Sequence, residues 1–209
     1  MVGRLGWIAG FGSLALGLLR LRQLLRPGEG GLSWELVVVA AALLGAVVTW
    51  AADAYRLPSW LTLALNGAGI GLTLLRVAVS DSLALGIVPT GDTWAGAGRE
   101  LGFALEVIRF GSAPVIPAAG LVAILAGVFW GLSSLVAWGL LVGRPVAGLA
   151  PPFFFYLQLA TIDRRPIHPV WTAALLIAVA ASLMAWAAVD HPAGSGRLRR
   201  PDGRPLRGA

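Results

Sequence analysis

The chain has 209 residues, of which 57% are hydrophobic and 12% charged, and its mean hydropathy is +0.80. This composition excludes an ordinary soluble domain and predicts an all-α, polytopic membrane protein. The net charge of +6 does not indicate nucleic-acid binding, because the basic residues are all arginines and, apart from a cluster in the tail, are dispersed at the ends of apolar segments. The absence of cysteine excludes disulfides, thiolate metal sites and cysteine nucleophiles.

Six apolar segments are predicted to cross the membrane, because about 20 apolar residues span a bilayer core. The first has no signal-peptide cleavage pattern, and we interpret it as a retained helix that ends in the snorkelling side chains of Arg20 and Arg22. The predicted spans cover residues 5–25, 34–52, 57–76, 117–142, 145–162 and 169–189.

Polar and small residues inside these spans are the candidates for contacts between helices. Gly67 and Gly71 have the small-xxx-small spacing that allows two helices to approach closely. No ionisable residue lies in the middle of a span, so the default sign of a transport pathway is missing. Interhelical hydrogen bonds, worth roughly 0.6 to 2 kcal/mol each, are expected from Asn66, Ser133, Ser134 and Gln158.

The longest connection, between the third and fourth spans, predicts a helix on the membrane surface. Its second half has apolar residues at Trp94, Leu101, Leu105 and Ile108, and most charged residues fall elsewhere. This spacing is typical of an amphipathic helix that lies in the interface. We therefore predict an interfacial segment at about 92–110.

The fourth and fifth spans are predicted to form a hairpin with prolines and a glycine at its bends. Two prolines mark where the chain enters the fourth span, and a Gly-Arg-Pro sequence makes the turn into the fifth. The fifth span starts with two further prolines, which predict a kinked or irregular beginning. The hinge positions are Pro114, Pro117, Gly143, Arg144, Pro145, Pro151 and Pro152.

The C-terminal segment 190–209 is rich in glycine, proline and arginine and predicts a disordered basic tail. Six spans place both termini on one side, and arginines are then divided equally, with eight on each side. The dense cluster in the tail favours cytoplasmic termini in a bacterial cytoplasmic membrane.

The chain offers few groups for catalysis or for binding metals and cofactors. Its two histidines, His168 and His191, each adjoin a proline at a span boundary and are interpreted as interfacial turn residues. No zinc-protease, nucleophile-elbow or P-loop sequence occurs. We expect no catalytic, metal or cofactor site, and we interpret Trp130 and Trp138 as packing residues.

Several fragments resemble the N-terminal membrane region of TgpA-type transglutaminase-like proteins. They are Y-R-L-P-S-W-L-T-L, V-P-T-G-D-T-W, S-A-P-V-I-P-A-A-G-L and G-R-P-V-A-G-L-A-P-P-F-F-F-Y-L, which occur in this order within residues 34 to 189. In that family the region precedes an extracytoplasmic transglutaminase-like domain with a Cys-His-Asp triad. The resemblance implies that this chain is the membrane module, either separated from its enzyme by truncation or encoded without it. The acidic residue that the family has in its fourth span is missing here, which puts the role of that acid in doubt.

These observations lead to two expected functions. The first is a non-catalytic membrane module that anchors or scaffolds a transglutaminase-like domain or cell-envelope partners, within the lipid bilayer and without nucleic acid. The alternative is a small transporter or channel subunit with a polar path through spans three to five. An enzyme that acts on lipid is a third interpretation, which the missing acid–base pair disfavours.

Overall fold

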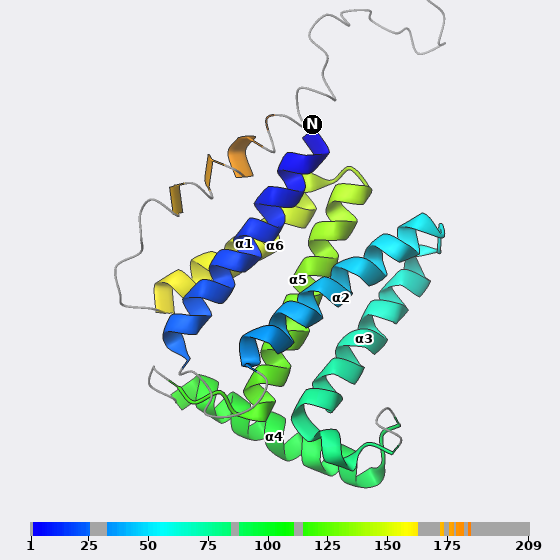
Figure 1. The fold of residues 1–209 in the computed structure, drawn as a ribbon, viewed down its shortest axis with the longest axis vertical. Coiled ribbons are helices and arrows are strands. Elements are labelled where there is room, and N and C mark those ends of the chain that lie inside the picture. The colour runs from blue at the N-terminus through cyan, green and yellow to red at the C-terminus, as the bar shows by residue number, and fades with distance from the viewer. Residues whose placement is uncertain are drawn as a thin grey trace, which may run out of the picture.

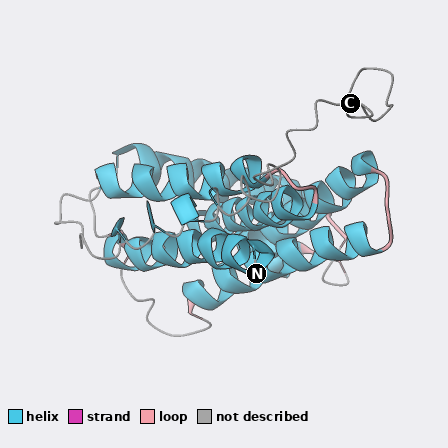
Figure 2. Cartoon of the chain, turned by 90° about the horizontal axis from the view of Figure 1, so that it is seen from above, coloured by secondary structure: helices cyan, strands magenta, loops and turns pink. Residues whose placement is uncertain are grey.

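The structure, a computed structural model, consists of helices joined by short turns and loops in the part of the chain that it describes. It describes residues 2–25, 33–84, 88–110 and 115–162, together with 172–173, 176–177, 179–181 and 184. Within these residues two isolated bridges, Leu25 with Val115 and Ala84 with Val88, are the only β-type pairings, and there is no strand. The predicted all-α class is therefore confirmed for the described chain, as Figure 2 shows.

Six α-helices and one 3-10 turn make up the described fold. They are α1 (Val2–Leu24), α2 (Trp34–Ala54), α3 (Ser59–Val79), η1 (Ser80–Ser82), α4 (Gly91–Phe110), α5 (Ala119–Leu141) and α6 (Pro145–Ile162). The long helices run alternately up and down, and α4 crosses the end of the bundle opposite the N-terminus (Figure 1). The α2–α3 and α5–α6 turns lie at the same end as the N-terminus.

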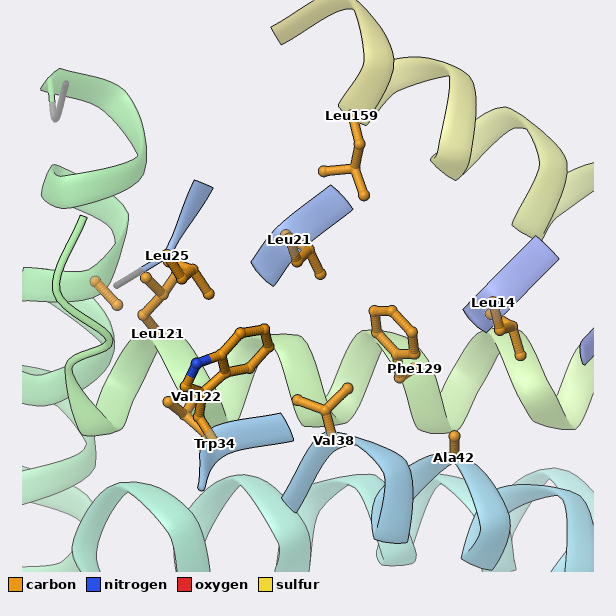
Figure 3. Packing of buried hydrophobic residues seen from close by; sticks show 11 residues of the cluster. Leu14, Leu21, Leu25, Trp34, Val38, Ala42, Leu121, Val122, Phe129 and Leu159 are labelled. Carbon is orange, nitrogen blue, oxygen red and sulfur yellow. The ribbon is translucent and has the colours of Figure 1, made fainter. Parts of the chain in front are cut away.

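Helix α5 is the centre of the bundle and contacts α1, α2, α3, α4 and α6. Figure 3 shows Phe129 of α5 in the same core as Leu14 of α1 and Val38 of α2. Leu159 of α6 belongs to this core as well. The outward faces are apolar too, with Leu43 of α2 55% exposed and Leu63 of α3 75% exposed. Helices that are apolar on every side are typical of a membrane environment.

Three of the described helices are long and apolar enough to cross a membrane: α2, α3 continued through Ser82, and α5. They correspond to the predicted spans 34–52, 57–76 and 117–142. The prediction of six spans is not supported, because α1 and α6 form helices at the predicted positions but are not among the three that qualify. The arginines of α1 weaken its apolar character. Most of 169–189 and all of 190–209 lie outside the described residues.

The two arginines at the end of α1 differ from each other in exposure. Arg20 is 6% exposed and its Nη1 donates to Gln23 Oε1 at 3.0 Å, so the prediction that it snorkels outward was wrong. Arg22 is directed outward, with its Nε 3.8 Å from Glu35 Oε1 at the start of α2. An exposed pair at this distance adds at most about 1 kcal/mol.

Both turns at the N-terminal end of the bundle close with the same backbone geometry. After α5, Gly143 has φ 73° and the Arg144 amide donates to Gly139 O at 2.7 Å. After α2, Arg56 has φ 53° and the Leu57 amide donates to Ala52 O at 2.8 Å. These are Schellman turns, in which glycine is the usual residue at the left-handed position. The arginine at position 56 therefore adopts a conformation that costs a residue with a Cβ about 1 kcal/mol.

The predicted hinge residues are placed as follows. Pro117 precedes α5, which begins at Ala119, so it lies at the entry to this helix. Pro145 begins α6, where its missing N–H costs nothing. The helix then runs without interruption through Pro151 and Pro152, so an irregular start is not observed. Pro114 lies outside the described residues.

Helix α4 confirms the predicted helix at 92–110 and lies across the bundle end. Its inner face consists of small residues, with Thr93 and Ala104 0% exposed, and the backbone of α5 approaches it closely at Gly120. The predicted apolar residues Trp94 and Ile108 are 61% and 57% exposed. This apolar flank is directed away from the bundle, and its contact with a membrane remains a prediction.

The first turn of α4 is held by a reciprocal pair of threonines. Thr90 precedes the helix, its Oγ1 accepts from the Thr93 amide at 3.3 Å, and Thr93 Oγ1 accepts from the Thr90 amide at 3.0 Å. This is a capping box in which threonine replaces the usual acidic residue. Thr93 Oγ1 also donates to Ser82 O at 2.6 Å, which ties η1 to α4.

Thr93→Val is expected to destabilise this first turn by about 1 to 2 kcal/mol, because valine keeps the shape but loses the hydroxyl group. Amide hydrogen exchange of residues 90–96 should accelerate, while exchange in α5 stays unchanged. Thr62→Val is the control, since the Thr62 hydroxyl makes one long, exposed bond of 3.4 Å. Equal acceleration in both variants would contradict the role of the capping box.

Candidate functional site

The side chain of Asn66 joins three helices at one buried point. Its Nδ2 donates to Thr49 Oγ1 of α2 at 3.2 Å and to Thr62 O of its own helix at 3.0 Å. Its Oδ1 accepts from Trp130 Nε1 at 3.0 Å and from Ser134 Oγ at 2.8 Å, both on α5. We call Asn66, Thr49, Trp130 and Ser134 the polar node; each is at most 9% exposed.

The orientation of the Asn66 amide follows from the chemistry of its partners. The Trp130 indole nitrogen is a donor only, so the amide atom that faces it must be the oxygen. The NH2 group then faces Thr49 and the Thr62 carbonyl. An amide has two N–H donors and two lone pairs, and each of the four faces a partner within the protein. Asn66 therefore has no hydrogen-bonding capacity left for a transported ion or a substrate.

The serines of α5 differ in what they bind. Ser134 lies within reach of Asn66 Oδ1 at 2.8 Å and of Trp130 O at 2.9 Å, and its single proton serves one of these at a time. Ser133 is fully buried and donates to Trp130 O at 2.9 Å within its own helix. Of the predicted interhelical contacts, the structure thus brings together Asn66 and Ser134. The Ser133 bond stays within α5, and Gln158 is exposed on α6, a helix that contributes no residue to the node.

Two members of the node were not predicted from the sequence. Trp130 was interpreted as a packing residue, although a buried indole N–H usually finds an acceptor. Thr49 has no distinguishing signal in the sequence, because threonine hydroxyls in helices often bond to their own backbone, as Thr49 Oγ1 does by donating to Gly45 O at 3.0 Å. The available signal was the spacing of Trp130 and Ser134, which places both on one face of α5.

Glycines set the distances between the helices that form the node. A Cβ at Gly45 would lie 2.6 Å from Trp130 O, and a Cβ at Gly69 would lie 2.3 Å from the Trp130 ring. At Gly67 and Gly71 a Cβ would meet no described atom within 4 Å. The predicted packing through Gly67 and Gly71 is therefore absent within the described chain, and Gly69 takes that role.

A groove of about 530 Å³ opens beside the node, between the second half of α2, the first half of α3 and the second half of α5. Its inner part is formed by Thr49, Asn66 and Ser134, and apolar side chains form its walls. Asp53 and Ser59 line it near the α2–α3 turn, and Trp138 lines it from α5. Clefts of this size and lining bind small apolar or amphiphilic molecules in many proteins.

The described residues contain no group of three or more His, Cys, Asp or Glu side chains that is placed to hold a metal ion. His168 and His191 lie outside the described residues. The arrangement within the described chain is therefore a structural clamp beside an apolar groove.

The resemblance to TgpA-type proteins stays a prediction after comparison with known proteins. No protein-family model, curated protein or solved structure matches this chain.

Proposed function

We propose that this chain is a non-catalytic integral membrane module that anchors or scaffolds an extracytoplasmic transglutaminase-like domain or other cell-envelope partners. The observation that carries the proposal is the saturation of Asn66. A polar residue inside a membrane bundle is a candidate for transport chemistry. When its donors and lone pairs all face partners within the protein, as those of Asn66 do, it acts as a clamp between helices. Such a clamp fixes the mutual positions of α2, α3 and α5, which is what a scaffold requires.

The proposal includes six spans, adding α1, α6 and residues 169–189 to the three helices that qualify by composition. Support comes from the register of α1 against α5. A Cβ at Gly6 would touch the Leu140 side chain, and one at Gly10 would touch Val136. Helix α1 thus lies alongside the same stretch of α5, and a membrane that holds α5 holds α1 at the same depth.

Because the chain has no cysteine, single cysteines can be introduced to test the topology without background labelling. With cytoplasmic termini, Tyr55→Cys and Arg144→Cys should react with an impermeant maleimide only after bacterial cells are permeabilised. Asp81→Cys and Asp92→Cys, at the opposite end of the bundle, should react in intact cells. The inverse pattern would overturn the proposed orientation, and labelling of both pairs from one side would overturn the membrane-spanning arrangement.

The scaffolding role predicts a specific partner in the native membrane. The tagged chain, crosslinked in cells and purified, should retain a protein with a Cys-His-Asp transglutaminase-like domain. Thr62→Val leaves the clamp in place and should retain the same partner, whereas Gly45→Leu separates α2 from α5 and should lose it. Recovery without any such protein would reject this role.

The alternative function is a small transporter or channel subunit. The groove favours it, because polar groups of Thr49, Thr62 and Asn66 line one side of an open space within the bundle. Flux through proteoliposomes that Asn66→Leu or Gln158→Leu abolishes would support the alternative. Equal flux in the variants and the parent chain would count against it.

A further inference from the structure

We infer that the groove between α2, α3 and α5 is a binding site for a cationic amphiphile, a molecule with one alkyl chain and an ammonium head. The inference goes beyond the scaffolding role and does not depend on it. Three features of the groove carry it: apolar walls, an inner end that needs no polar partner, and an anionic mouth.

The walls of the groove suit an alkyl chain. Leu57, Leu63, Ile70, Leu135 and Leu141 contribute most of the lining between the polar ends. Leu63 lines the groove and is still 75% exposed, so the groove opens sideways toward the surrounding lipid. A chain can therefore enter laterally from a bilayer, and burial of its methylenes provides about 0.8 kcal/mol each relative to water.

The inner end of the groove offers no free hydrogen-bond donor to a ligand. Asn66 uses both of its N–H donors and both lone pairs within the protein, and Thr49 already donates to Gly45 O. Ser134 likewise directs its only proton to Asn66 Oδ1 or Trp130 O. A ligand acceptor such as a carboxylate oxygen would find no free donor there, which costs about 1 to 3 kcal/mol. The end of an apolar chain needs no donor and fits this position. Between Ser59 and Ile70 the groove follows α3 for roughly 16 Å at 1.5 Å per residue, a length that accommodates a dodecyl chain.

The mouth of the groove selects a positive charge. Asp53 is the only ionisable side chain in the lining, and no described residue forms an ion pair with it. Trp138 lines the groove from α5, and alkylammonium groups are attracted to aromatic rings. Arg56 and Arg144 lie in the turns at this end of the bundle, but neither lines the groove. The lining therefore attracts a cationic head and repels a carboxylate or sulfate.

Two glycines on α3 provide a matched pair of variants. A side chain at Gly67 meets no described atom within 4 Å and extends into the groove, which Gly67 lines. Gly71 is equally open and one helical turn further along, but it does not line the groove. Gly67→Leu should therefore fill the site without disturbing the bundle, and Gly71→Leu should leave the site empty and accessible.

The test is isothermal titration calorimetry of dodecyltrimethylammonium into the full chain in phosphatidylcholine nanodiscs, with empty nanodiscs subtracted to remove partitioning. The parent chain and Gly71→Leu should show one saturable site of equal affinity. Gly67→Leu should weaken binding about tenfold or more, because filling the site displaces the alkyl chain. Gly131→Leu is a second filling variant, since a Cβ there has 3.9 Å to its nearest neighbour, Ile70 Cδ1.

The charge of the head is tested with ligands of the same chain length. Dodecanoate should bind about tenfold more weakly than dodecyltrimethylammonium, and Asp53→Asn should weaken only the cation, about fivefold for an exposed charge. Unchanged affinity in both filling variants, or equal binding of dodecanoate and the cation, would overturn the inference. Because binding is measured on the purified chain, failure to find a transglutaminase-like partner leaves this result unaffected.

Discussion

Asn66→Leu is expected to lower the free energy of unfolding by about 2 kcal/mol. The substitution removes both α2–α3 and α3–α5 hydrogen bonds at the polar node and leaves the buried Trp130 Nε1–H without an acceptor. An unsatisfied buried donor costs about 1 to 3 kcal/mol, whereas an interhelical bond in a membrane averages about 0.6 kcal/mol. The orphaned indole therefore dominates the expected loss.

Unfolding in mixed micelles with increasing dodecyl sulfate measures this loss, and a double-mutant cycle separates its parts. Trp130→Phe removes the donor, so adding Asn66→Leu to it should cost clearly less than Asn66→Leu in the parent chain. Strictly additive losses would mean that Asn66 and Trp130 do not interact. No loss in Asn66→Leu would contradict the clamp itself.

Gly139→Leu is expected to lower the free energy of unfolding by about 3 kcal/mol, at the upper end for overpacking. A Cβ at position 139 would lie 2.5 Å from both Gly148 N and Gly148 Cα, which are backbone atoms of α6 and cannot rotate away. The two helices must separate, and the edge-to-face contact of Phe129 with Phe155 at 5.6 Å is lost with them.

Gly131→Leu on the same helix is the matched control, because a Cβ there would lie at ordinary contact distance, 3.9 Å, from its nearest neighbour, Ile70 Cδ1. We expect its thermal unfolding midpoint to stay near that of the parent chain, while Gly139→Leu unfolds at a clearly lower temperature or fails to accumulate in membranes. Equal midpoints for the two variants would show that α5 and α6 are not in contact at Gly139.

Helix positions could be predicted from the sequence because apolar segments, prolines and glycines mark their ends. The segments predicted at 34–52, 57–76 and 92–110 correspond to α2, α3 and α4 within a few residues. The number of spans was not predictable in the same way. Helix α1 contains Arg20, whose burial depends on its position in the bundle, and sequence alone does not show whether an arginine at a helix end reaches outward or lies inside.

The face of α3 that meets α5 was predicted incorrectly for a physical reason. Glycines at 67, 69 and 71 lie on different sides of the helix, and an apolar helix has no polar side to fix its rotation. The decisive residue is Asn66, which must be directed into the protein because its amide needs partners. Gly69, three positions later, shares that side, and it is Gly69 that makes room for the Trp130 ring.

The polar node also has a consequence for the order in which the helices assemble. Thr49 and Asn66 are 17 positions apart, so the Asn66 NH2 group can be satisfied as soon as α2 and α3 form a hairpin. The carbonyl oxygen of the same amide has to wait for Trp130 and Ser134, 64 and 68 positions further along the chain. During synthesis the α2–α3 hairpin thus forms first, and Asn66 Oδ1 remains without its α5 donors until α5 packs against it. The unsatisfied oxygen of the Asn66 amide therefore favours the docking of α5 at this position on the hairpin.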